Sequence, residues 1–130
     1  MNYGLLKTGT TFLEVKEHCG EAYDFLFEMV GGFIEFIQLS WVCDFKIPAE
    51  LKDVVIVLNQ EGKLKNKALP INLYSIFDTL HGNMVFAKQE YSEIYEANTT
   101  VGLSNNQIEL LSQVVPKLVE TSKKIKCQIQ

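Results

Sequence analysis

The sequence predicts an α+β domain with a mainly antiparallel sheet, an early helix, a short middle helix and a Pro-kinked C-terminal helix. Three observations support this fold class. Short apolar runs separated by turn residues are typical of strands. Residues 20–29 repeat apolar side chains at helical spacing, and residues 104–126 carry a long apolar stripe. The expected order is two strands, a helix, three strands, a short helix, a strand and a last helix.

The first elements are expected to be strands at 3–7 and 11–16, joined by a glycine-containing turn. The helix 20–29 follows them, with apolar and acidic side chains on opposite sides. Gly31 or Gly32 should end this helix, because glycine adopts the left-handed cap conformation at little cost.

The middle of the chain is predicted to contain strands at 33–39 and 41–45, where β-branched and aromatic residues gather. The blurred alternation in 33–39 indicates burial on much of both faces. Residues 54–58 give the strongest strand signal, an unbroken apolar run best buried on both faces. A short helix is expected at 72–80 and a last strand at 84–87.

The C-terminal helix is predicted to begin at Ser104, because Gln107 three positions later completes a capping box. Pro116 should kink it, since proline removes a backbone donor and clashes with the preceding turn. Its apolar stripe is wider than one small sheet needs to cover. A homo-oligomer contact through this helix is therefore expected.

Length and composition suit one domain over residues 1–130, with a sheet core in 1–103 and the C-terminal helix in 104–126. The chain is 47% hydrophobic and 22% charged, which is normal for a globular protein. It contains no continuous apolar run long enough to span a bilayer, and the N-terminus lacks the pattern of a signal peptide. A cytoplasmic protein without membrane contact is expected.

The net charge is −4, and all twelve basic residues are lysines. Duplex nucleic acid is usually held by clustered lysine and arginine, so DNA binding is disfavoured. Without arginine, a bound phosphate must be held by lysine, backbone N–H groups or hydroxyls. The local cluster Lys63, Lys65 and Lys67 either forms a solvated hairpin or faces such an anion.

The cysteine and histidine residues give little support for a disulfide, a metal site or a catalytic role. Cys19, Cys43 and Cys127 are odd in number and far apart, so neither a disulfide framework nor a metal site is expected. His81 has Asp78 nearby, but sequence proximity is not triad geometry. The chain also lacks the common nucleophile, zinc and phosphate-loop motifs. No catalytic residue and no cofactor are therefore predicted.

Segment 69–84 places polar groups at the ends of apolar elements and favours binding over catalysis. Asn72 and Asn83 each present two donors and an acceptor, which suit a base edge or a ribose hydroxyl, although asparagine also favours turns. Other candidates either contact a ligand by stacking or close backbone approach, or serve the core and helix cap. They are Phe12, Tyr74, Phe77, Gly31 and Gly32.

Four ordered motifs carry a resemblance to known proteins: MVGGFIE at 29–35, NQEGKL at 59–64, LPIN at 69–72 and GNMVF at 82–86. Over residues 3–87 the chain resembles a small phage- and prophage-associated domain family. With its length and helical C-terminus, it is similar to the first type of phage Thoeris anti-defence proteins. Those proteins bind the cyclic ADP-ribose isomer that signals in bacterial immunity and do not cleave it.

The resemblance implies a cyclic nucleotide partner, the host bacterial cytoplasm and a homo-oligomer, either a dimer or a trimer of dimers, with pockets between subunits. Some relatives also bind cyclic oligonucleotides. By position, the implied pocket residues are those around the two asparagines: Leu73, Tyr74, Gly82, Asn83 and Met84. Arginines that contact phosphate in relatives have no counterpart here, which leaves lysines, such as those at 63–67, or backbone N–H groups as local substitutes. The alternatives are a phage protein that inhibits a host protein by direct binding and a nucleotide-cleaving enzyme.

Overall fold

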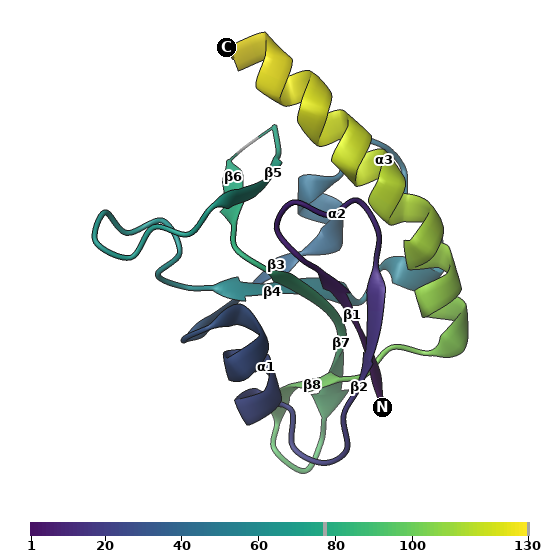
Figure 1. Ribbon diagram of the computed structural model, residues 1–130. Coiled ribbons are helices and arrows are strands. Elements are labelled where there is room, and N and C mark those ends of the chain that lie inside the picture. The colour runs from purple at the N-terminus through teal and green to yellow at the C-terminus, as the bar shows by residue number, and fades with distance from the viewer. Residues whose placement is uncertain (77, 130) are drawn as a thin grey trace.

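The computed structural model describes residues 1–76 and 78–129. Within them, a six-stranded antiparallel sheet carries helices on both faces, and a separate two-stranded hairpin stands beside it (Figure 1). The sheet strands are β1 (Asn2–Leu6), β2 (Glu14–Glu17), β3 (Ile34–Gln38), β4 (Val54–Asn59), β7 (Met84–Ser92) and β8 (Ala97–Val101). The hairpin is β5 (Ile71–Tyr74) with β6 (Thr79–His81). The helices are α1 (Tyr23–Val30), α2 (Leu39–Val42), the short 3₁₀ turn η1 (Ala49–Leu51) and α3 (Asn105–Ile129).

Strands β4 and β7 are central in the order β2-β1-β7-β4-β3, with β8 paired to the far part of β7. Alternate residues of β4 face opposite sides. Val55 and Val57 pack with Leu26 of α1, whereas Val54 and Ile56 join the core under α3. Both faces of β4 are therefore buried, as the apolar run predicts. The predicted fold class, α+β with a mainly antiparallel sheet, is confirmed.

The two predicted helix boundaries are confirmed by their caps. Gly31 adopts φ 79°, and its N–H donates to the carbonyl of Phe27 at 2.9 Å. At the start of α3, the Gln107 N–H donates to Ser104 Oγ at 3.1 Å and the Ser104 N–H donates to Gln107 Oε1 at 3.0 Å. Gln107 Nε2 also donates to the carbonyl of Glu50 at 3.1 Å, which ties the helix to η1.

Helix α3 continues through Pro116 to Ile129 and buries its apolar stripe within the same chain. Leu111 and Val115 are fully buried, and Leu118 is 4% exposed. This arrangement corrects the argument for an oligomer contact. The stripe is wide because it covers the sheet and the β5–β6 hairpin together, so it leaves little surplus apolar surface for a second subunit.

Two local predictions are wrong. Residues 41–45 are not a strand, because Leu39 and Val42, three positions apart, both enter the core through one helical turn, α2. The described residues of 72–80 do not form a helix but belong to the β5–β6 hairpin, in which Leu73 and Leu80 pair across the strands and are buried together. The short middle helix of the fold is therefore α2.

The burial expected for residues 33–39 is also corrected. Strand β3 lies at the edge of the sheet, and Phe36 is 42% exposed. The final predicted strand is longer than 84–87, since β7 continues to Ser92 and turns into β8. In the described part of the chain, no helix combines the length and the apolar character that crossing a bilayer requires.

Candidate functional site

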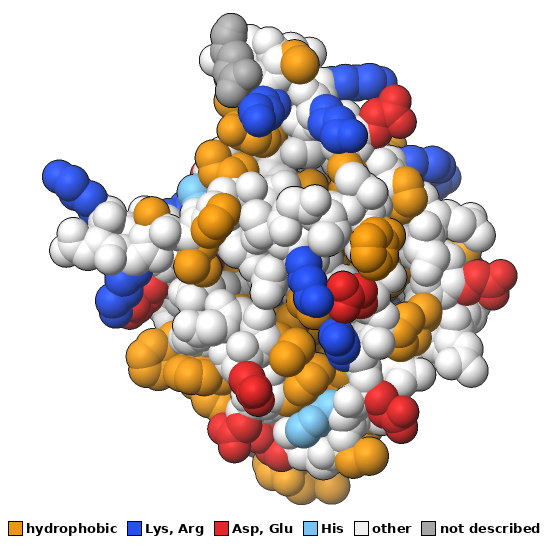
Figure 2. All heavy atoms as spheres, viewed as in Figure 1, with side chains coloured by type: hydrophobic (Ala, Val, Ile, Leu, Met, Phe, Trp, Pro, Cys, Tyr) orange, Lys and Arg blue, Asp and Glu red, His pale blue; other side chains and the backbone are white. Residues whose placement is uncertain are grey.

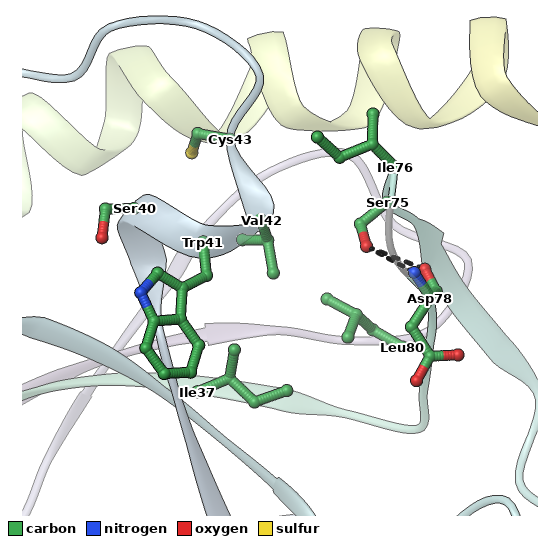
Figure 3. A pocket seen from close by; sticks show the side chains of 9 residues that line it. All are labelled: Ile37, Ser40, Trp41, Val42, Cys43, Ser75, Ile76, Asp78 and Leu80. Atoms are coloured by element: carbon green, nitrogen blue, oxygen red, sulfur yellow. Dashed lines mark hydrogen bonds between the residues drawn. The ribbon is translucent and has the colours of Figure 1, made fainter.

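A cavity of about 620 Å³ lies between the end of β3 with α2 and the β5–β6 hairpin (Figure 3). Trp41 and Ile37 stand on one side, and Leu80 and Asp78 on the other. Most of the lining is apolar. The lining residues are Ile37, Ser40, Trp41, Val42, Cys43, Ser75, Ile76, Asp78 and Leu80.

Two further cavities continue this hollow. One, of about 240 Å³, shares Ile37, Asp78 and Leu80 with it and is more polar. Its other lining residues are Glu35, Leu58, Asn59, Gln60, Lys63 and His81. The other, of about 470 Å³, shares Ile76 and reaches Lys117 and Lys124 of α3. The three together are called the β3 groove, which has an apolar centre and lysines at both ends.

The exposed indole of Trp41 follows from the local fold. Helix α2 turns Leu39 and Val42 inward, so Ser40 and Trp41 must face outward. Trp41 is 62% exposed and presents a flat aromatic surface to the groove. A large exposed aromatic ring beside a cavity is suited to stacking on a planar ligand.

Asp78 forms the polar corner of the groove at the hairpin turn. Its carboxylate pairs with Lys63 and also accepts the Thr79 N–H at 2.8 Å. The hydrogen bond from Lys63, followed by the one from Thr79, lowers the pKa of Asp78. The Asp78 N–H donates to Ser75 Oγ at 3.1 Å, which fixes the turn. An anionic ligand would compete with Asp78 for Lys63.

His81 is held as a structural residue. Its Nδ1 lies 2.8 Å from the Leu69 carbonyl, which only accepts, so Nδ1 carries the proton. Nε2, 2.8 Å from Thr79 Oγ1, then accepts from that hydroxyl. Both ring nitrogens are engaged, and neither is placed to act as a base towards the groove. Among the described residues, no three His, Cys, Asp or Glu side chains gather as a metal site.

Cys43 lines the groove but is a poor nucleophile. Burial, with a smaller contribution from the charge of Asp44, raises the pKa of the Cys43 thiol to about 12. The thiol therefore stays protonated at neutral pH, whereas reactivity belongs to the thiolate.

Thiol labelling tests this environment. Ellman's reagent added to the folded protein at pH 8 should react rapidly with the exposed Cys19 and Cys127 and slowly with Cys43. Denaturant should then release the third thiol. Equal rates for all three thiols in the folded state would contradict the protected environment of Cys43.

The structure gathers three of the sequence-predicted residues around a different cavity. Gly31, Gly82 and Asn83 line a hollow of about 270 Å³ with Thr8 and Pro70. Asn83 Oδ1 accepts the Thr8 N–H at 3.2 Å, and its Nδ2 donates to the Met29 carbonyl at 3.5 Å. Asn83 thus ties the β1–β2 loop to the end of α1 beside this cavity.

Asn72 links two neighbouring backbone segments through its side-chain amide. Its Nδ2 donates to the carbonyl of Leu6 at 3.0 Å and to that of Gly82 at 2.9 Å. Nearby, Gly82 has φ 77°, and a Cβ there would lie 2.7 Å from Leu69 Cδ1. Both residues therefore have structural reasons for their identity.

Asn72→Ala is expected to lower the free energy of unfolding by about 1–3 kcal/mol, because two half-buried carbonyls lose their donor. Ligand affinity should not change. Urea denaturation measures the first quantity and calorimetry the second. An unchanged unfolding free energy combined with weaker binding would instead make Asn72 a ligand contact.

The other predicted residues are dispersed. Leu73 and Met84 are 3% and 0% exposed and belong to the core, so they present almost no side-chain surface to a ligand. Gly32 packs closely, since a Cβ there would lie 2.9 Å from Asn59 Nδ2. Phe77 lies outside the described residues. Four residues lie outside the groove lining: half-buried Tyr74, exposed Phe12, exposed Lys65 and Lys67, which pairs with Glu61.

Sequence reasoning missed Trp41, Ile37 and Asn59. The β-rich composition of 41–45 hid the helical turn that exposes the indole. The useful signal was the chain's single tryptophan, placed between Leu39 and Val42 at helical spacing. Asn59 and its neighbour Gln60 line the groove only because β3 and the hairpin fold beside them.

Comparison with known proteins gives no indication of function, so the functional argument rests on the β3 groove. No family model, no curated protein and no solved structure matches this chain.

Proposed function

We propose that this chain binds a nucleotide-derived small molecule in the β3 groove and retains it without chemical change. One observation carries the proposal: the exposed indole of Trp41 faces an apolar cavity of about 620 Å³ that continues into a polar cavity containing Lys63. This volume is in the range of small-molecule sites, which combine apolar walls with a few placed polar groups.

The groove offers a distinct contact for each part of such a ligand. A base would stack on Trp41 and pack against Ile37 and Leu80. Phosphates would be drawn to Lys63 at one end or to Lys117 at the other, in agreement with a chain that has no arginine. Ribose hydroxyls would meet the amide of Gln60 in the polar cavity.

Retention without cleavage is favoured by the state of the groove's reactive groups. Cys43 is held as a thiol, and both nitrogens of His81 are engaged. Cleaving a glycosidic or phosphate bond would need a positioned base, an activated nucleophile or a metal ion. The side chains of the groove are therefore suited to contacting a ligand.

The biological setting of the proposal comes from the resemblance to phage anti-defence proteins. The ligand would be a cyclic ADP-ribose isomer or another cyclic nucleotide immune signal, sequestered in the host bacterial cytoplasm. A sequestering protein acts by stoichiometric binding, so it needs a pre-organised pocket more than a transition-state site. A homo-oligomer remains part of this proposal, with a contact outside the buried stripe of α3.

A thermal-shift panel of cyclic ADP-ribose isomers, cyclic dinucleotides and cyclic trinucleotides tests the function. A true ligand at about 100 times its Kd should add about 2.7 kcal/mol of stability and raise the Tm. The ligand released by heat denaturation should be recovered intact, as mass spectrometry can show. The proposal fails if no compound raises the Tm, and a cleaved product would point to the enzyme alternative.

A further inference from the structure

A second aromatic cavity, of about 580 Å³, lies on the sheet face covered by α1. It is bounded by the start of α1, by the edge strand β3 and by β8 with its turn. We call it the α1–β8 cavity. Its lining residues are Met1, Tyr3, Gly20, Glu21, Ala22, Tyr23, Leu26, Ile34, Phe36, Tyr95, Thr99 and Thr100. The β3 groove is lined from the opposite face of β3, by Glu35 and Ile37.

Three exposed aromatic rings form its walls. Tyr23, Phe36 and Tyr95 are 44%, 42% and 74% exposed, and they come from α1, β3 and the β7–β8 turn. Further exposed apolar side chains lie nearby: Phe33, 56% exposed, is linked to Tyr23 through ring contacts with Phe27, and Ile94, 87% exposed, precedes Tyr95 in the turn. Exposed apolar surface of this kind marks an interaction site more often than chance.

Carboxylates outnumber positive groups around the cavity. Residues 17–36 contain five carboxylates and no lysine, and residues 89–101 contain three carboxylates and no lysine. In Figure 2, several acidic side chains lie around the lower end, where Figure 1 places α1 and the β7–β8 hairpin, whereas the lysines lie in the middle of the view, towards the α3 terminus and on the β4–β5 loop. Within the cavity, the N-terminal ammonium of Met1 already donates to the His18 carbonyl at 3.0 Å.

Glu21 places one carboxylate in the cavity wall. Its Oε1 accepts the Tyr23 N–H at 2.7 Å, which fixes the carboxylate at the start of α1. Its charge, after burial as the larger cause, raises the pKa of the neighbouring Tyr3. A fixed carboxylate among aromatic faces attracts a cation, because the carboxylate is negatively charged and the ring faces carry negative electrostatic potential.

We propose that the α1–β8 cavity receives a lysine or arginine side chain from a basic segment of a partner protein. The aromatic walls and Glu21 suit the cationic head, and the acidic surroundings steer a basic segment towards it. The exposed apolar surface at Ile94 and Phe33 extends beyond what a small amine would cover. This inference concerns a different surface from the β3 groove and does not depend on the function proposed there.

The test uses a short fluorescein-labelled peptide with an Arg-Lys-Arg centre and a matched peptide with a Gln-Gln-Gln centre. Fluorescence anisotropy at about 0.15 M ionic strength should show saturable binding of the basic peptide and none of the neutral one. Tyr95→Ser should weaken binding about fivefold, because one cation–π face is lost. Glu21→Gln should also weaken it while keeping an oxygen that can accept the Tyr23 N–H.

Glu93→Gln is the matched control, since it removes the same charge from the β7–β8 turn without touching the cavity lining. It should leave peptide affinity nearly unchanged, and circular dichroism should confirm that all variants fold. Equal losses from Glu93→Gln and Glu21→Gln would overturn the inference in favour of general charge attraction. Absence of peptide binding would overturn the inference as well. The same holds if sedimentation shows that a second copy of the chain occupies this surface instead.

Discussion

Trp41→Ala is expected to weaken binding of the nucleotide ligand by about fivefold or more, because stacking of one base on an aromatic ring contributes about 1–3 kcal/mol. The indole is 62% exposed, so its removal leaves no cavity in the core and should not lower the stability of the free protein. Isothermal titration calorimetry with the best ligand of the thermal-shift panel measures the change. Trp41→Phe should restore part of the affinity, since a smaller ring remains.

Phe12→Ala is the control for this experiment. Phe12 is 58% exposed, close to the exposure of Trp41, but it lies in the β1–β2 loop outside the β3 groove. Its removal should leave ligand affinity unchanged. If both variants lose affinity equally, or if Trp41→Ala binds as the unchanged chain does, then the ligand does not lie in the β3 groove. The cavity around Asn83 would be the next place to examine.

Sequence patterns sufficed where one local rule decides the structure. The unbroken run at 54–58 needs burial on both faces, and β4 provides it at the centre of the sheet. The pair Ser104 and Gln107 satisfies the first N–H groups of α3, and the glycine at 31 adopts a conformation that other residues avoid. These features depend on neighbours in the sequence, so composition and spacing reveal them.

The groove could not be predicted, because it depends on distant segments. Lys63 of the β4–β5 loop meets Asp78 at the hairpin turn, and Trp41 faces Leu80 from another element. The β propensity of residues 41–45 was overruled by the burial of Leu39 and Val42, which required a helical turn. Tertiary contacts also explain why the helix predicted at 72–80 is replaced by a hairpin. Its strands β5 and β6 pair with each other, and β5 packs on α3.

Asparagine shows why residue type alone did not locate the site. A side-chain amide suits both a ligand and a backbone, and only the fold decides between them. Asn72 donates to two carbonyls of its own chain, and Asn83 links Thr8 to Met29. Asn59 similarly donates to the Val30 carbonyl at 3.2 Å and accepts the Glu61 N–H at 2.8 Å.

Leu111→Ala is expected to lower the free energy of unfolding by about 2–5 kcal/mol, the usual cost of truncating a large buried side chain. Leu111 is fully buried in the core that joins α3 to the sheet, so the deleted atoms leave a cavity. Urea denaturation followed by circular dichroism gives the change. Ile129→Ala, at a position 65% exposed near the end of the same helix, should stay within about 0.5 kcal/mol of the unchanged chain.

The same two variants separate a core helix from a subunit contact. If the α3 stripe belongs to the core, sedimentation should give Leu111→Ala the same association state as the unchanged chain while its unfolding midpoint falls. If the stripe were instead an interface between copies, Leu111→Ala would dissociate the assembly, and unfolding of the separated subunit would cost nearly as much as before. Because Leu111, Val115 and Leu118 contact the chain's own core, the loss of stability should occur without dissociation.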